Sequence, residues 1–109
     1  MLHLISEGLL DKKGKEIVNI DLRNLNDAPC DNFIICHGDS STQVRALADS
    51  VEEKALIAGE RPGHREGLEN AIWVLLDFGT IVVHLFQREA REYYKLEDLW
   101  GDADFTMIK

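Results

Sequence analysis

The fold is decided by residues 32–51, which read NFIICHGDSSTQVRALADSV. The first six of these residues form a continuous apolar run bounded by turn residues, which predicts a strand buried on both faces. Ser40 and Gln43 then form an S-x-x-Q capping box, and apolar residues follow at helical spacing as far as Gly59. A buried strand that leads directly into a long capped helix favours a mixed sheet covered by helices.

The residues before this unit predict a helix and a second strand. Leucine and isoleucine at helical spacing predict a short amphipathic helix over residues 2–11. Alternation of apolar and polar residues predicts a strand over 16–22, and the polar, proline-containing stretch 23–31 predicts a loop.

The residues after this unit predict a connector, a hairpin and a last helix. Residues 60–70 leave room for a connector or a short edge strand. Two apolar, β-branched runs at 71–77 and 80–86, separated by Phe78-Gly79, predict an antiparallel hairpin with a two-residue turn. Residues 89–99 then predict a short helix.

Length, composition and element order together indicate the fold class. The chain has 109 residues, of which 45% are hydrophobic and 29% charged, as in a globular protein of one domain. The element order indicates an α/β (α+β) fold, with residues 1–109 forming a single domain around a mixed β-sheet flanked by helices. The amino terminus lacks the features of a signal peptide, and no apolar run approaches about 18 residues, so we expect a cytoplasmic protein without a membrane span.

The charge balance points to the chemistry of a partner. The chain carries 20 acidic and 12 basic side chains, for a formal net charge of −8. The average field repels nucleic-acid phosphates and anionic lipid and attracts basic protein surfaces. A basic protein partner is therefore favoured over DNA or a membrane.

The cysteines and histidines predict no metal or redox site. Cys30 and Cys36 are too few for a disulfide framework and do not form a C-x-x-C pair. The chain's four histidines fall on separate predicted elements without an H-x-x-x-H pair, so we expect neither a metal ion nor a cofactor; they are His3, His37, His64 and His84. His84 lies inside the second run of the hairpin, where a half-buried, hydrogen-bonded histidine is the usual finding.

One segment favours an enzymatic hypothesis. Gly38-Asp39-Ser40-Ser41 enters a helix directly after a strand, where backbone N–H groups could bind an anion. Phosphoryl or nucleotidyl transfer also needs carboxylates for a divalent metal, and the strands offer only the isolated Asp21 and Asp77. The one D-x-D sequence, residues 102–104, is expected to be a solvated acidic terminus. Ser40 and Ser41 then serve as helix-capping residues.

Aromatic and charged residues gather in the final third of the chain. Large rings surrounded by charges are typical of a protein-binding face, but a hydrophobic core uses large rings too, and the spacing leaves both readings open. The residues concerned are Trp73, Phe78, Tyr93, Tyr94 and Trp100, beside Asp77, Glu89, Arg91 and Glu92.

Several segments resemble one family, in the same order and spacing. They read WVLLDFG at 73–79, VVHLF at 82–86, EAREYY at 89–94 and LEDLW at 96–100, with DNFIICHGDSS upstream at 31–41. Together they are similar to the ribosomal silencing factor (Iojap-like) family over nearly the whole chain. The first helix is short for this family, which suggests a trimmed start.

The resemblance implies a fold related to a minimal nucleotidyltransferase core that has lost its catalytic carboxylates, and so a binding protein and not an enzyme. It implies binding to the large ribosomal subunit through its fourteenth protein, which blocks the small subunit and represses translation in starvation. It also implies a homodimer. The acidic charge of the chain fits a basic ribosomal partner.

The resemblance also implies a contact face. Trp73, Asp77 and Phe78 would form its centre, with further residues around it, namely Glu66, Glu89, Arg91 and Tyr94. Two alternatives stay open. One is a nucleotidyltransferase-like enzyme that uses residues 38–40 and Asp77, and the other is an interaction protein for a different complex.

Overall fold

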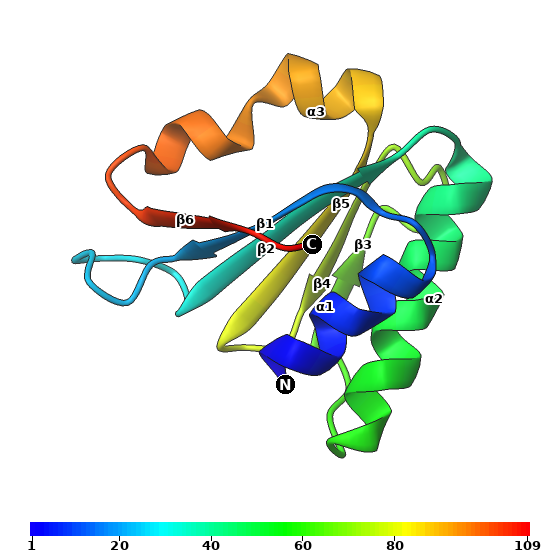
Figure 1. Ribbon diagram of the computed structural model, residues 1–109, viewed down its shortest axis with the longest axis horizontal. Helices are drawn as coiled ribbons and strands as arrows, with labels where there is room; N and C mark the ends of the chain where they lie inside the picture. Colours follow the sequence, from blue (N-terminus) through cyan, green and yellow to red (C-terminus); the bar gives the residue numbers. More distant parts are fainter.

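The computed structural model describes residues 1–109 and is built around one mixed sheet of six strands. In chain order the elements are α1 (Leu2–Asp11), β1 (Lys15–Asp21), β2 (Asn32–Gly38), α2 (Ser41–Ile57), β3 (His64–Glu66), β4 (Trp73–Asp77), β5 (Ile81–Gln87), α3 (Arg88–Tyr94), the 3₁₀ helix η1 (Leu96–Trp100) and β6 (Asp104–Met107). The sheet order is β3-β4-β5-β2-β1-β6, with α1 and α2 on one side and α3 on the other (Figure 1). The predicted α/β class with a mixed sheet is confirmed.

The two central strands are parallel and the remaining pairs are antiparallel. β2 and β5 run side by side from the pair Asn32–Ile81 to the pair Gly38–Gln87. Almost every residue of both strands is buried, which agrees with their unbroken apolar runs because a strand covered on both faces has no polar side. Their carboxyl ends therefore lie together at one end of the sheet.

Helix α2 begins and ends as its sequence predicts, with one difference at the cap. The Ser40 hydroxyl accepts a hydrogen bond from the Gln43 backbone N–H at 3.1 Å. The Gln43 side chain does not accept a hydrogen bond from the Ser40 backbone N–H, as a capping box would have it. Instead its Oε1 accepts from the Asp39 N–H at 2.8 Å and its Nε2 donates to the Lys13 carbonyl at 3.1 Å. At the other end Gly59 has a φ of +74° and closes the helix.

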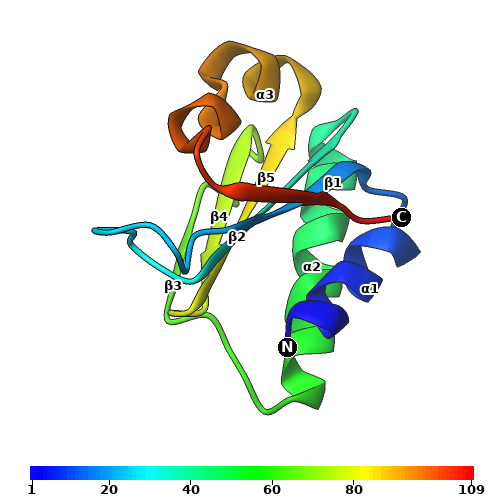
Figure 2. The same cartoon turned by 60° about the vertical axis from the view of Figure 1, so that its left-hand side comes forward.

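The sheet divides the core into two layers, and Figure 2 shows the helices on either side of it. The layer under α1 and α2 contains 15 buried residues, including Ile5, Leu9, Val44 and Leu47 from the helices. The layer on the side of α3 contains 8 buried residues, with Trp73, Leu75, Leu96 and Trp100 partly buried against it. Because side chains alternate along a strand, the four strands β1, β2, β4 and β5 each supply residues to both layers.

The hairpin forms, but its turn lies one residue later than predicted. Phe78 N–H donates to the Ile81 carbonyl at 2.9 Å, so Gly79 and Thr80 are the two turn residues. Gly79 has a φ of +89°, which a two-residue hairpin turn requires and glycine adopts without strain. The strand before the turn begins at Trp73 and not at residue 71, because Ala71 has a φ of +53° and cannot continue a strand.

The carboxyl-terminal quarter differs more from the prediction. The helix predicted over 89–99 is interrupted at Lys95, whose φ of +48° ends α3 and starts η1. The expectation of a solvated acidic terminus is wrong in part: Asp104 stands opposite Asp21 as β6 pairs with β1. This pairing satisfies backbone groups that β1 would otherwise expose at the sheet edge. None of the helices has the length and apolar character needed to cross a membrane.

Candidate protein-binding face

A partly exposed tryptophan marks one edge of the sheet. Trp73, Leu75 and Asp77 lie at alternate positions of β4, all half-buried, on the face of the sheet that α3 partly covers. Glu66 of the edge strand β3 stands opposite Leu75. With Gly67 and Tyr94 these residues form what we call the Trp73 face.

The Trp73 face is hollowed. A hollow of about 350 Å³ is lined by Glu66, Gly67, Trp73 and Leu75. Gly67 has a φ of +81°, and a Cβ atom there would overlap the Trp73 carbonyl oxygen. The absence of a side chain therefore lets the chain pass close to the backbone at the start of β4.

The Trp73 ring is held from three directions. Its ring centre lies 4.9 Å from that of Phe86 below it and 4.9 Å from that of Tyr94 on α3. Its indole nitrogen donates to Nδ1 of His84 at 3.1 Å. Large rings held in fixed positions with part of their surface open are typical of the energetic centre of a protein interface.

Four of the residues expected on the contact face meet here. Trp73, Asp77 and Glu66 come from the paired strands β3 and β4, and Tyr94 joins them from α3 through its ring contact with Trp73. Glu89 is exposed on the first turn of α3. Asp77 also has a structural contact, because its Oδ1 accepts from the Gly79 N–H at 2.8 Å.

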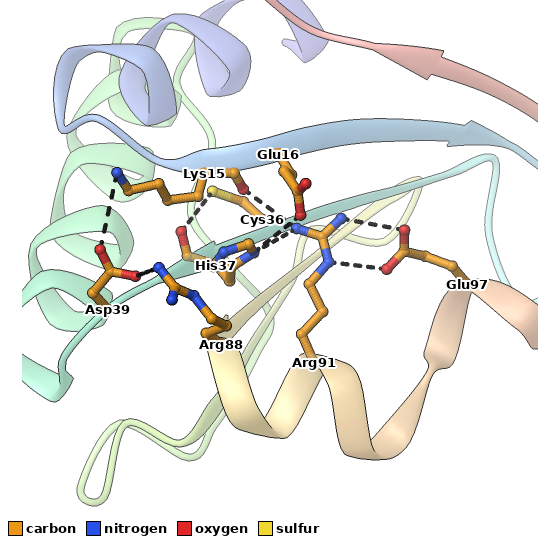
Figure 3. A network of polar contacts seen from close by, with 8 residues as sticks. All are labelled: Lys15, Glu16, Cys36, His37, Asp39, Arg88, Arg91 and Glu97. Atoms are coloured by element: carbon orange, nitrogen blue, oxygen red, sulfur yellow. Dashed lines mark hydrogen bonds and ion pairs between the residues drawn. The ribbon is translucent and has the colours of Figure 1, made fainter.

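Two of the expected residues lie elsewhere. Phe78 directly follows β4 and packs against the core under α1 and α2, on the opposite side of the sheet from Trp73, because successive side chains of an extended chain point to opposite faces. Arg91 is buried, 8% exposed, and its side chain turns from α3 toward His37 and Glu97 (Figure 3). Nothing in the sequence indicated the inward turn of Arg91, whereas Phe78 directly follows Asp77 and alternation along the strand predicts the other side of the sheet for it.

Arg91 lies in a second hollow, which is polar. This hollow of about 440 Å³ lies beside α3, near the carboxyl ends of β2 and β5, and its lining residues are Glu16, His37, Arg88, Arg91, Glu92, Lys95, Glu97 and Asp98. Such a position is a common ligand site in α/β proteins. Two of the cationic side chains that line this hollow already form ion pairs within the protein, Arg91 with Glu97 at 2.9 Å and Arg88 with Asp39 at 2.6 Å.

Arg91 joins three elements. It donates to Nδ1 of His37 at 3.0 Å, to the Lys15 carbonyl at 3.3 Å and to both carboxylate oxygens of Glu97. Burial and then the Arg91 charge lower the pKa of His37, partly opposed by Glu16. His37 therefore stays neutral and can accept the hydrogen bond, so the network fixes α3 on the sheet.

The residues of the enzymatic hypothesis are not brought together. Gly38 aligns with Gln87 at one end of β5, whereas Asp77 aligns with Val82 near the other end. Five residues of strand separate the two positions, which is roughly 16 Å at about 3.3 Å per residue. No group of three His, Cys, Asp or Glu side chains is arranged to hold a metal ion. Burial also raises the pKa of the Cys36 thiol to about 12, which keeps it protonated.

Sequence reasoning missed several residues of the Trp73 face. Leu75 could have been predicted on this face, because it lies two residues after Trp73 in the same strand. The only sign of Gly67 in the sequence was its place in a turn. His84 was expected to be half-buried and hydrogen-bonded; it is hydrogen-bonded to the Trp73 indole through one nitrogen, but it is more deeply buried, with 4% of its surface exposed.

Comparison with known proteins identifies the family. The family model described as ribosomal silencing factor during starvation matches residues 1–109. The chain is 41% identical over 103 residues to the ribosomal silencing factor RsfS of Halalkalibacterium halodurans, covering 94% of this chain and 87% of that protein. It is 42% identical over 93 residues to RsfS of Bacillus subtilis, covering 85% of this chain and 78% of that protein.

Solved structures agree with the sequence matches. A crystal structure of a protein from Chromobacterium violaceum superposes with a TM-score of 0.87 at 42% identity, covering 92% of this chain and 82% of the other. A protein from Bacillus halodurans superposes with a TM-score of 0.80 at 39% identity, covering 91% of each chain. The earlier resemblance is thus confirmed, and the chain belongs to the ribosomal silencing factor family.

Proposed function

We propose that this protein binds the large ribosomal subunit through the subunit's fourteenth protein and thereby blocks the small subunit, which represses translation in starvation. In this proposal it acts in the cytoplasm as a steric binding protein and catalyses no reaction. Membership of the ribosomal silencing factor family supports the general role. The observation that carries the binding site is the half-exposed Trp73 beside its hollow at the sheet edge.

The chemistry of the Trp73 face fits a basic protein partner. Tyr94 is 51% exposed and extends the aromatic surface of Trp73, while Glu66 and Asp77 carry negative charge on the same face. Aromatic rings supply buried area, and surrounding charges guide a partner of opposite charge toward the correct orientation. The net charge of −8 acts in the same direction.

The other expected residues have different parts in this proposal. Glu89 on α3 adds a negative charge at the edge of the contact. Arg91 acts indirectly, because it holds α3 and hence Tyr94 in place. Phe78 supports β4 from the core on the other side of the sheet. Self-association as a homodimer would compete with ribosome binding if it used the Trp73 face.

Co-sedimentation with isolated large subunits tests the proposal. Asp77→Arg reverses a charge on the Trp73 face, and we expect it to abolish binding. Glu53→Arg is the matched control, because Glu53 is exposed on α2, on the opposite side of the sheet. Asp77→Asn keeps an oxygen that can accept from Gly79, so it separates loss of charge from damage to the turn.

The outcomes decide between the hypotheses. The proposal is supported if the Glu53→Arg variant binds large subunits and the Asp77→Arg variant does not. Binding of the native protein should also weaken as salt is added, because ions screen the charges at the rim of an interface. Native protein that fails to bind cognate large subunits would overturn it. Magnesium-dependent nucleotide binding would then be measured to test the enzymatic alternative.

A further inference from the structure

His84 occupies a position that an apolar residue would fill with less difficulty. It lies in the middle of the central strand β5, with Ile35 on one neighbouring strand and Leu75 on the other as its register partners. Only 4% of its surface is exposed. The Phe33 ring packs against it edge to face at 4.7 Å.

The one hydrogen bond of His84 has a defined direction. An indole N–H only donates, so Nδ1 of His84 accepts from Trp73 and carries no proton. The neutral ring therefore has its hydrogen on Nε2. That Nε2 atom is buried and has no hydrogen-bond partner in the protein.

This unpaired donor shows that the fold alone does not explain the histidine. A buried polar atom without a partner destabilises the folded state, whereas a phenylalanine or leucine would fill the same space without that penalty. What a histidine offers here, and an apolar residue does not, is an acceptor for the Trp73 indole. Local features that weaken a fold are concentrated at functional sites.

The acceptor determines which way the indole faces. Phe86 and Tyr94 pack against the Trp73 ring at tilts of 30° and 45°, and such apolar ring contacts do not distinguish the nitrogen edge of the indole from its carbon edge. The hydrogen bond to His84 allows only the orientation with the nitrogen turned inward. Trp73 also lines the hollow with Glu66 and Leu75, so this orientation decides which part of the ring is presented there.

We propose that His84 is a positioning residue, which holds the Trp73 indole in the single orientation that the partner meets. The inference rests on the proposed binding function of the Trp73 face. His84 itself is buried and does not contact the partner. Its effect on binding comes from fixing the ring in advance, because a ring already held in its bound orientation loses less freedom on association.

Three substitutions of His84 distinguish the effect of its hydrogen-bond acceptor from the effects of its size and polarity. His84→Asn places an amide oxygen near the position of Nδ1, and His84→Gln places its amide near Nε2. His84→Phe keeps an aromatic ring without an acceptor. We expect binding to large subunits to weaken about tenfold in His84→Phe and His84→Gln, the effect of about one hydrogen bond, and to remain within about threefold of native in His84→Asn.

The free protein supplies a second measurement that needs no partner. The indole N–H resonance of Trp73, assigned with Trp73→Phe, should show hydrogen bonding in the native protein and in His84→Asn and lose it in His84→Phe. Trp100 is an internal reference, because its indole nitrogen is buried without a partner in the native protein. Thermal unfolding should show that His84→Phe is as stable as the native protein or more so.

The two measurements separate failure of this inference from failure of the proposed function. An unchanged Trp73 resonance in His84→Phe, or native binding by a folded His84→Phe, would overturn the positioning role. If His84→Phe does not fold, the comparison of His84→Asn with His84→Gln decides, since equal binding by the two would also overturn it. Native protein that does not bind large subunits would reject the proposed function, while the indole resonances would still report on the hydrogen bond.

Discussion

Arg91 and Glu97 form a two-pronged ion pair across the junction of α3 and η1, with Nε and Nη2 of the guanidinium donating at 2.9 and 3.2 Å. The Arg91 side chain is 9% exposed, whereas the Glu97 side chain is 29% exposed. The buried charge of the pair therefore belongs to Arg91. Removal of the carboxylate and removal of the guanidinium should have different effects.

Glu97→Ala should lower the free energy of unfolding by about 2 to 3 kcal/mol, because it leaves a buried guanidinium without its carboxylate. Arg91→Met should lower it less, since it removes the charge and keeps an apolar chain of similar length. Urea unfolding measures both values, and Glu92→Ala on the exposed side of α3 is the control. A larger loss in Arg91→Met than in Glu97→Ala would contradict this account of the pair.

Gly67→Ala should be much more destabilising than Gly59→Ala. The two glycines have similar φ values, +81° and +74°, so the backbone strain of an alanine is about 1 kcal/mol at each. At Gly59 a Cβ meets no atom, whereas at Gly67 it overlaps the Trp73 carbonyl. We expect a further loss of about 2 kcal/mol at Gly67 by thermal unfolding. Equal losses would show that β3 can move away from β4 at little cost.

Ser40→Ala should lower the stability by about 1 kcal/mol, whereas Ser41→Ala should change it by less than about 0.5 kcal/mol. The difference follows from the hydrogen bond that the Ser40 hydroxyl accepts from Gln43 N–H, for which Ser41 has no counterpart. Chemical denaturation of the two variants measures it. A similar effect of both substitutions would mean that the cap does not depend on this hydroxyl.

The stability of the protein should fall in mild acid because of His84. Burial lowers the pKa of His84 to about 4 in the folded protein, and only Asp77 opposes this shift. The unfolded chain takes up the proton near its ordinary pKa of about 6.5. This contribution is therefore fully present above pH 6.5 and is lost as the pH falls from 6.5 toward 4, by roughly 3 kcal/mol in total.

This loss of stability is checked by urea unfolding of the native protein and of His84→Phe at several pH values between 7 and 4.5. The native protein should lose stability more steeply over that range, because other groups, including His37 with its lowered pKa, are shared by both proteins. Parallel curves for the two proteins would show that His84 takes up its proton at a similar pH in the folded and unfolded chains.

Much of the candidate site could be predicted from the sequence, but its arrangement could not. The alternation of β4 places Trp73 and Asp77 on one face, and its continuation into the next residue places Phe78 on the other, which was available from the order of residues alone. The inward turn of Arg91 was not, because it depends on Glu97 and on His37, which lies 54 residues away in the chain. A charged residue on a short amphipathic helix is otherwise expected to face solvent.

The sequence by itself determined the buried strand β2, the capped helix α2, the hairpin and the family, because apolar period, capping residues and glycine positions act over a few neighbouring residues. Only the tertiary structure decided that residues 104–107 pair with β1, that Lys95 interrupts the last helix, and that His84 bonds the Trp73 indole. The strand pairing joins residues more than 80 positions apart, and the Trp73–His84 bond joins side chains on two neighbouring strands. Backbone and side-chain groups bond whichever complementary group the assembled sheet brings near, and local sequence patterns do not encode that choice.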